Sequence, residues 1–231
     1  MEFYEGAVLK KVILLHTVKT VYESFGAQLK ELIAEDIILN NILDDFLADD
    51  PARNEGVFSK NNRLRLLKDL ESAQLAGPDL IVVTCSTLSP YIPELRDYFS
   101  TPIIAIDDAM CEEALTKGSR ITVLATAISA VDPVVHKLES MGRERGKAVK
   151  IDSYCNPEAI KALKTGDRNV HDALVLEMAK HVRNTDVIVF AQASMAHMAE
   201  PVSAATGIPT LASPGLCQKR IVEFLGLNGK K

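Results

Sequence analysis

The chain has 231 residues, with 26 basic and 31 acidic side chains and a net charge of −5. Apolar residues make up 47% and charged residues 25%, as in ordinary globular proteins, and the length suffices for one large α/β domain or two small ones. No basic stripe stands out, and no apolar run reaches the roughly 18 residues of a membrane-spanning helix. We therefore expect a protein that binds neither nucleic acid nor a membrane.

Eight short apolar runs alternate with longer amphipathic stretches along the chain. Several runs are apolar at nearly every position, which is typical of parallel strands buried on both faces. Apolar residues at helical spacing predict helices over residues 62–76 and 171–182. The alternation of strands and helices indicates an α/β fold with parallel sheets. The predicted strands are residues 12–15, 37–42, 80–83, 103–106, 121–124, 149–151, 187–190 and 210–212.

Three landmarks repeat in the two halves of the sequence. The strand in IVVTCST ends at Cys85, 17 residues before the proline of TPIIAID, and VIVFAQAS places Gln192 17 residues before the proline of IPTLASP. Upstream, His16 in VILLHT and Thr126 in ITVLAT precede these positions by 69 and 66 residues. The spacing predicts a duplicated α/β unit.

A duplicated unit implies two pseudo-symmetric parallel-sheet halves with a cleft between them. We expect residues 1–107 plus 209–231 to form the first half and residues 108–208 the second. Ligands of such sheets bind outside the carboxyl ends of the strands, so side chains that follow strands should line the cleft. These side chains are His16, Cys85, Thr87, Thr126, Gln192 and Ser194.

Cys85 is the strongest candidate for chemistry. It follows a buried strand, Ser86 and Thr87 come next, and a helix is expected to begin near Ser89 or Pro90. Backbone N–H groups at a helix start attract an anion, and a thiol in that setting can act as a base or a nucleophile. The alternative is a small buried cysteine that only packs at the end of a strand.

The other strand-end residues suggest binding more than proton transfer. Gln192 and Ser194 can hydrogen-bond a carboxylate, although an amide does not exchange protons at working pH. Thr126 and Ser129 suit either helix capping or carboxylate binding. His16 is either a general acid or base or a satisfied structural histidine.

The remaining histidines and cysteines carry less weight. His136, His171 and His181 are expected on helix surfaces, and His197 is a weaker candidate near Gln192. The other three cysteines are far from Cys85 and from one another, with no CxxC pair, which argues against disulfides and structural zinc and fits a reducing cytoplasm. These three are Cys111, Cys155 and Cys217, of which the first and last could supply a second thiol.

The order and spacing of VVTCST, LATAIS and VIVFAQAS resemble the aspartate/glutamate/hydantoin racemase superfamily over nearly the whole chain. The resemblance implies two α/β halves, an active site between them, no cofactor and no metal. It also implies one cysteine in each half, and the two exchange a proton beside a substrate carboxylate from opposite faces. Cys85 matches the first of these cysteines, and Gln192 stands where the second belongs. His16 and Thr17 replace the Asp-Ser pair of many glutamate racemases.

The missing second thiol leaves three functions open. We predict a racemase or isomerase without a cofactor that acts beside the carboxylate of a small acid or amino acid, with Cys85 and His16 as catalytic residues. A one-base decarboxylase or lyase of the arylmalonate decarboxylase type, or a non-catalytic carboxylate-binding protein, is the alternative. The resemblance is also compatible with a homo-oligomer. The predicted substrate-binding residues are Thr17, Ser86, Thr87, Thr126, Ser129, Gln192, Ala193 and Ser194.

Overall fold

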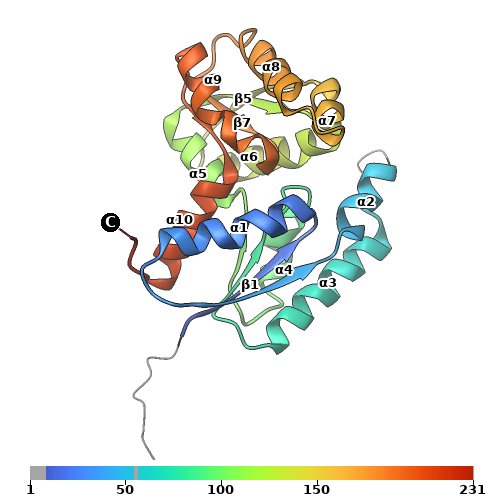
Figure 1. The fold of residues 1–231 in the computed structure, drawn as a ribbon, viewed down its shortest axis with the longest axis vertical. Helices are drawn as coiled ribbons and strands as arrows, with labels where there is room; N and C mark the ends of the chain where they lie inside the picture. The colour runs from blue at the N-terminus through green and yellow to red at the C-terminus, as the bar shows by residue number, and fades with distance from the viewer. Residues whose placement is uncertain (1–8, 55–56, 231) are drawn as a thin grey trace, which may run out of the picture.

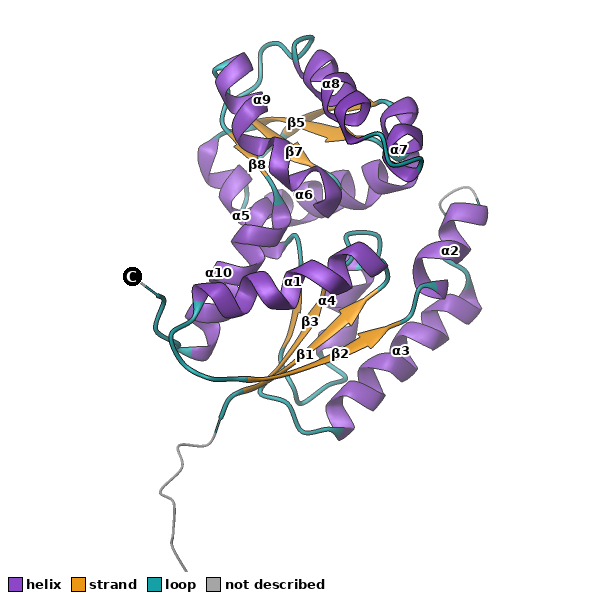
Figure 2. Ribbon diagram, in the orientation of Figure 1, coloured by secondary structure: helices purple, strands orange, loops and turns teal. Residues whose placement is uncertain are grey.

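Two four-stranded parallel sheets, each flanked by helices, form the protein in a computed structural model that describes residues 9–54 and 57–230 (Figures 1 and 2). The first sheet has the order β2-β1-β3-β4 and the second the order β6-β5-β7-β8. The strands are β1 Lys11–His16, β2 Ile38–Leu43, β3 Leu80–Val83, β4 Ile103–Ala105, β5 Arg120–Ala125, β6 Lys150–Cys155, β7 Val187–Phe190 and β8 Thr210–Leu211. The identical strand order confirms the predicted α/β fold with two similar halves.

Helices connect successive strands in both halves, as parallel pairing requires. The first half contains α1 Lys19–Leu32, α2 Phe46–Arg53, α3 Lys60–Leu75, the 3₁₀ turn η1 Ser89–Tyr91 and α4 Ile92–Arg96. The rest of the chain contains α5 Asp108–Lys117, η2 Ile128–Ala130, α6 Val131–Glu144, α7 Pro157–Lys164, α8 Arg168–Ala179, η3 Ala193–Met198, α9 Ala199–Thr206 and α10 Ser213–Leu225. Every helix in the described part of the chain is too short or too polar to cross a bilayer.

The inner strands form the apolar centre of each half. All residues of β3 and β7 are buried, which explains why their sequences are apolar at every position. The edge strands β2 and β6 are mostly exposed. Their boundaries were harder to predict because polar residues interrupt the apolar pattern.

Backbone hydrogen bonds define which residues of the two halves are equivalent. The Thr84 N–H donates to the Leu15 carbonyl at 2.9 Å, and the Ala191 N–H donates to the Leu124 carbonyl at 3.0 Å. Cys85 and Gln192, one residue further on, therefore occupy equivalent places, as the repeat predicted. Thr17 and Thr126 are equivalent for the same reason, because each lies two residues beyond the carbonyl that accepts the bond. The sequence spacing pairs Thr126 with His16 instead, which is one residue too early.

The chain returns to the first half later than predicted. The last strand, β8, pairs with β7, so residues 210 and 211 belong to the second sheet and not to the first half. Helix α10 then packs on the first half, where Cys217 and Ile221 enter the apolar core and Gln218 Nε2 donates to the Phe25 carbonyl at 3.1 Å. Residues 1–8, assigned to the first half by the prediction, lie outside the described residues.

The carboxyl ends of the first-sheet strands face the second half. In Figure 2 the strands of the first sheet run upward and to the right, toward the second half. The loops that follow the inner strands of the first sheet therefore leave it on the side of the second half.

Candidate active site

Cys85 lies at the carboxyl end of the inner strand β3. Its side chain is half-buried and packs against the apolar core of the first half. The Leu88 N–H donates to the Cys85 carbonyl at 3.1 Å, so the chain turns directly after the thiol. A 3₁₀ turn begins at Ser89, where a helix was expected, but only the five-residue α4 follows it.

Unpaired hydroxyl groups occur close to Cys85 in the sequence and at the matching place in the second half. The half-buried side chains of Ser86 and Thr87 form no hydrogen bond with any described residue, and the same holds for Ser129 and Ser194. These four hydroxyls are available to donate to a bound anion.

His16 is enclosed by protein rather than directed at solvent. Its side chain is fully buried, with Nδ1 2.7 Å from Thr84 Oγ1 and Nε2 3.0 Å from Asn41 Oδ1. Burial lowers the pKa of His16, and the hydrogen bond with Asn41 only partly opposes this effect. A neutral ring can donate from Nε2 to Asn41 and accept at Nδ1 from the Thr84 hydroxyl, whose single proton is shared between Nδ1 and the Leu15 carbonyl, 3.1 Å from Oγ1. His16 therefore holds Thr84, the residue before Cys85.

Thr17 lies in the wall of a pocket of about 530 Å³ beside α2. The side chain is 3% exposed, and Oγ1 is buried without a hydrogen-bond partner among the described residues. Asp45, Asp49 and Arg53 also line this pocket, and Arg53 Nη2 lies 2.6 Å from Asp49 Oδ2. A buried hydroxyl without a partner beside a pocket can bind a ligand.

Three hydrogen-bond donors of the second half, called the donor ring below, surround the side-chain oxygen of Gln192. Its Oε1 accepts hydrogen bonds from the Thr126 N–H at 2.7 Å, the Ala127 N–H at 2.9 Å and the Thr126 hydroxyl at 3.0 Å. These contacts fix the amide group, and its Nε2 has no partner within the described residues. Gln192 thus offers an N–H donor at the position equivalent to the Cys85 thiol.

The other cysteines lie in different environments. Cys111 and Cys217 are fully buried, and burial raises the pKa of both thiols well above the usual value. Cys155, the last residue of β6, is half-buried, and burial raises its pKa too. Neither Cys111 nor Cys217 is therefore an accessible second thiol.

The two sets of predicted site residues remain separate in the hydrogen-bond network. Hydrogen bonds join Thr126 to Gln192 within the second half. Across residues 9–54 and 57–230, no hydrogen bond connects a predicted site residue of the first half to one of the second half. The halves meet close by, because α6 contacts η1 and Ala193 packs against the first-half core.

His171 differs from the sequence prediction. It was expected on a helix surface, yet its side chain is fully buried. In α8 it shares the buried face with Val175, Met178 and Ala179, which follow at helical spacing. This spacing was the signal that could have revealed its burial.

The sequence of the chain matches characterised and uncharacterised relatives over much of its length. A model of the Asp/Glu/hydantoin racemase family matches residues 12–216. An uncharacterised protein of Schizosaccharomyces pombe is 26% identical over 141 residues, 60% of this chain and 59% of the relative. A hydantoin racemase of Rhizobium meliloti is 24% identical over 163 residues, 70% of this chain and 66% of the relative. The matched segments thus span about three fifths to two thirds of these relatives.

The fold matches solved structures as well. Aspartate racemase of Picrophilus torridus superposes with a TM-score of 0.69 at 16% identity, and the match covers 96% of each chain. At this identity the likeness establishes the shared two-half fold. The family model covers most of the chain, and the chain therefore belongs to the Asp/Glu/hydantoin racemase family.

Proposed function

We propose that this protein is a racemase or isomerase without a cofactor that acts at the carbon next to the carboxylate of a small acid or amino acid, with Cys85 as acid and base. Family membership supports a racemase-type activity. The placement of Cys85 supports the assignment of the residue. It is a half-buried thiol after an inner strand, followed by two hydroxyls that have no hydrogen-bond partner among the described residues, whereas Cys111 and Cys217 are fully buried.

The surrounding residues have distinct roles in this proposal. The Cys85 thiolate removes the proton beside the carboxylate, and the resulting enediolate carries extra negative charge. Hydroxyl and amide donors stabilise that charge, and these are Ser86, Thr87 and the Nε2 of Gln192. Since both nitrogens of His16 are hydrogen-bonded inside the protein, we assign it a positioning role through Thr84.

Gln192 makes the proton transfer one-sided. An amide cannot deliver a proton to the face opposite Cys85, so racemisation requires a water molecule on that side. This feature favours a second candidate, a one-base decarboxylase or lyase, in which the Cys85 thiol protonates the enediolate left after CO₂ departs. Both reactions use the same thiol and the same oxyanion donors.

Deuterium exchange tests the proposal. The protein is incubated in D₂O with a panel of small carboxylic and amino acids, and exchange at the carbon beside the carboxylate is followed by NMR together with optical rotation. A racemase exchanges that hydrogen while optical rotation decays, whereas a decarboxylase releases CO₂ and incorporates one deuteron stereospecifically. We expect Cys85→Ala to abolish turnover and Cys155→Ala, a change at another half-buried thiol, to retain it.

Alkylation supplies the complementary measurement. Mass spectrometry follows the reaction of each cysteine with iodoacetamide in the presence and absence of each acid in the panel. An acid that protects Cys85 identifies the ligand class. Protection of Cys85 with neither exchange nor CO₂ release would contradict an enzymatic role and indicate a carboxylate-binding protein.

A further inference from the structure

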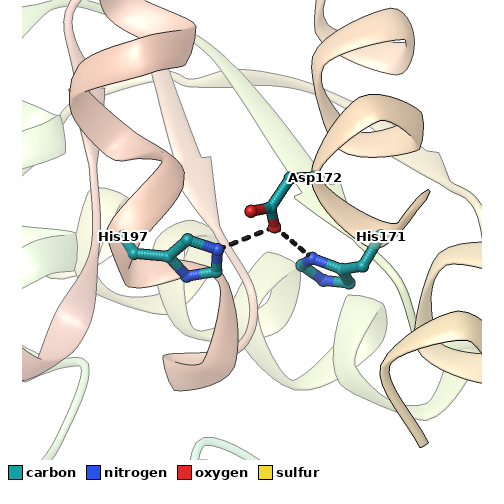
Figure 3. A group of neighbouring side chains, drawn as sticks. All are labelled: His171, Asp172 and His197. Carbon is teal, nitrogen blue, oxygen red and sulfur yellow. Dashed lines mark hydrogen bonds and ion pairs between the residues drawn. The ribbon is translucent and has the colours of Figure 1, made fainter. Parts of the chain in front are cut away.

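Two histidines and an aspartate converge on one point in the second half. His171 and Asp172 lie in the first turns of α8, and His197 lies in η3. Asp172 Oδ1 is 2.7 Å from His171 Nδ1 and 2.7 Å from His197 Nε2. Figure 3 shows both imidazole rings turned toward this one oxygen from opposite sides.

The donor set suits a first-row transition metal ion. Two imidazole nitrogens and a carboxylate oxygen are common ligands of Zn²⁺ and of neighbouring divalent ions, and a three-ligand site leaves a position for water. One ligand atom from each residue lies within 4.8 Å of the others. Ligand atoms of a tetrahedral Zn²⁺ site are about 3.3 Å apart, so modest side-chain rotations bring these three atoms into range. Of all residues described in the structure, these three form the one such cluster.

One nitrogen of the His171 ring lacks a partner. Nδ1 of this fully buried residue contacts Asp172, whereas Nε2, on the other side of the ring, has no hydrogen-bond partner among the described residues, and such orphaned groups in a protein interior often mark the place of a water or an ion. The cluster is also accessible from outside, since the side chains of Asp172 and His197 are 27% and 35% exposed. An ion can therefore enter from solvent without unfolding of the core.

We propose that His171, Asp172 and His197 bind one first-row transition metal ion, for which Zn²⁺ is the natural probe. The ion would link α8 to η3, the segment that directly follows Gln192 and contains Ser194. Its role is to fix this segment, and it takes no part in proton transfer at Cys85. The proposal is therefore independent of the reaction assigned above.

Metal titration of the full chain tests the site. Protein treated with chelator and then freed of it is titrated with Zn²⁺ by calorimetry near neutral pH, in a Cys85→Ala, Cys155→Ala background that removes both half-buried thiols as competing ligands. We expect one ion per chain, and an affinity lower by at least about tenfold in His197→Ala and in Asp172→Asn. Zn²⁺ should raise the thermal unfolding midpoint of the parent protein and not that of His197→Ala.

His181→Ala provides the matched control, since His181 is an exposed histidine just beyond the end of α8. It should bind Zn²⁺ like the parent protein. Because His197 is partly exposed, its replacement leaves the core intact, and circular dichroism verifies the fold. Equal Zn²⁺ affinity in the parent and in His197→Ala, or no measurable binding of Zn²⁺ or Co²⁺ to the parent, would overturn the proposal.

Discussion

Replacement of Gln192 tests the three-donor ring that distinguishes the second half. In Gln192→Ala, the N–H groups of Thr126 and Ala127 and the Thr126 hydroxyl lose their shared acceptor. A lost hydrogen bond costs about 1 kcal/mol net, and a buried donor left unsatisfied about 1–3 kcal/mol. Thr126 is fully buried, while Ala127 is half-buried and regains water. We therefore expect the free energy of unfolding to fall by about 2–4 kcal/mol.

The isosteric Gln192→Glu variant separates the effect of the three hydrogen bonds from the effect of side-chain volume. A carboxylate oxygen can accept the same three hydrogen bonds, and such charge-assisted bonds are about twice as strong as neutral ones. The free energy of unfolding near pH 7 should therefore be within about 1 kcal/mol of the parent value or above it. The three donors should depress the folded-state pKa of the new carboxyl below its unfolded value of about 4.3. The contribution of the carboxylate is then present above the unfolded pKa and is lost as pH falls through the folded pKa.

Urea unfolding followed by circular dichroism measures these effects, because the chain contains no tryptophan. Gln74→Ala is the matched control, since Gln74 is half-buried at a position outside the candidate site. Its Oε1 also accepts three hydrogen bonds, from Ser100 N, Ser100 Oγ and Thr101 N. Gln192→Ala should weaken the protection of Cys85 by a bound acid, whereas Gln74→Ala should not. If Gln192→Glu near pH 7 is as unstable as Gln192→Ala, the amide oxygen does not occupy a donor ring and our reasoning is wrong.

Two further predictions concern charged side chains, the half-buried Asp69 and the buried Lys137. Burial, together with the neighbouring charge of Asp44, raises the pKa of Asp69 to about 6, so its ionisation destabilises the protein as pH rises from about 4 to 6. In urea titrations near pH 7, Asp69→Asn should raise the free energy of unfolding by about 1–2 kcal/mol, allowing for solvent screening. The control Glu71→Gln, at an exposed position, should have no effect. An equal gain from Asp69→Asn at pH 4 would contradict an origin in the ionisation of Asp69. Lys137 is buried between two aspartates, with Nζ–O distances of 2.5 and 2.6 Å, and Lys137→Met should cost about 3–5 kcal/mol by the same measurement. Exposed Lys180→Met should change stability by less than about 0.5 kcal/mol, and a similarly small effect at position 137 would show that the buried pairs are not coupled to folding.

The parallel sheets could be predicted from the sequence because their inner strands leave no polar face. A run such as LIVV in β3 is buried at every position, so its composition alone identifies it. The repeat of these runs also predicts that Cys85 and Gln192 are equivalent strand-end residues. The backbone hydrogen bonds made by the preceding residues, Thr84 and Ala191, confirm this equivalence.

Side-chain partners could not be predicted in the same way. His16 meets Asn41 and Thr84 only because β1 pairs with β2 on one side and β3 on the other, and the register of pairing is absent from the local sequence. The buried ring of His171 and its carboxylate bridge to His197 depend on the packing of α8 against η3, elements that are separated by β7 in the chain. Contacts of this kind depend on tertiary structure and not on spacing.

The equivalence of the two halves also exposes their asymmetry. Thr17 and Thr126 occupy corresponding positions after the first strand of each sheet, yet the Thr126 hydroxyl donates to Gln192, while Thr17 Oγ1 has no partner among the described residues. The second half therefore satisfies its strand-end donors with its own side chain, and the first half leaves a hydroxyl and a thiol free for a ligand. An exchange of residues makes this argument testable: in Gln192→Cys, the three donors should lose their acceptor and a second alkylatable thiol should appear at the position equivalent to Cys85. If that thiol stays inert to iodoacetamide while Cys85 reacts, the second half does not face the same ligand space, and the one-sided chemistry proposed here would have to be located in the first half alone.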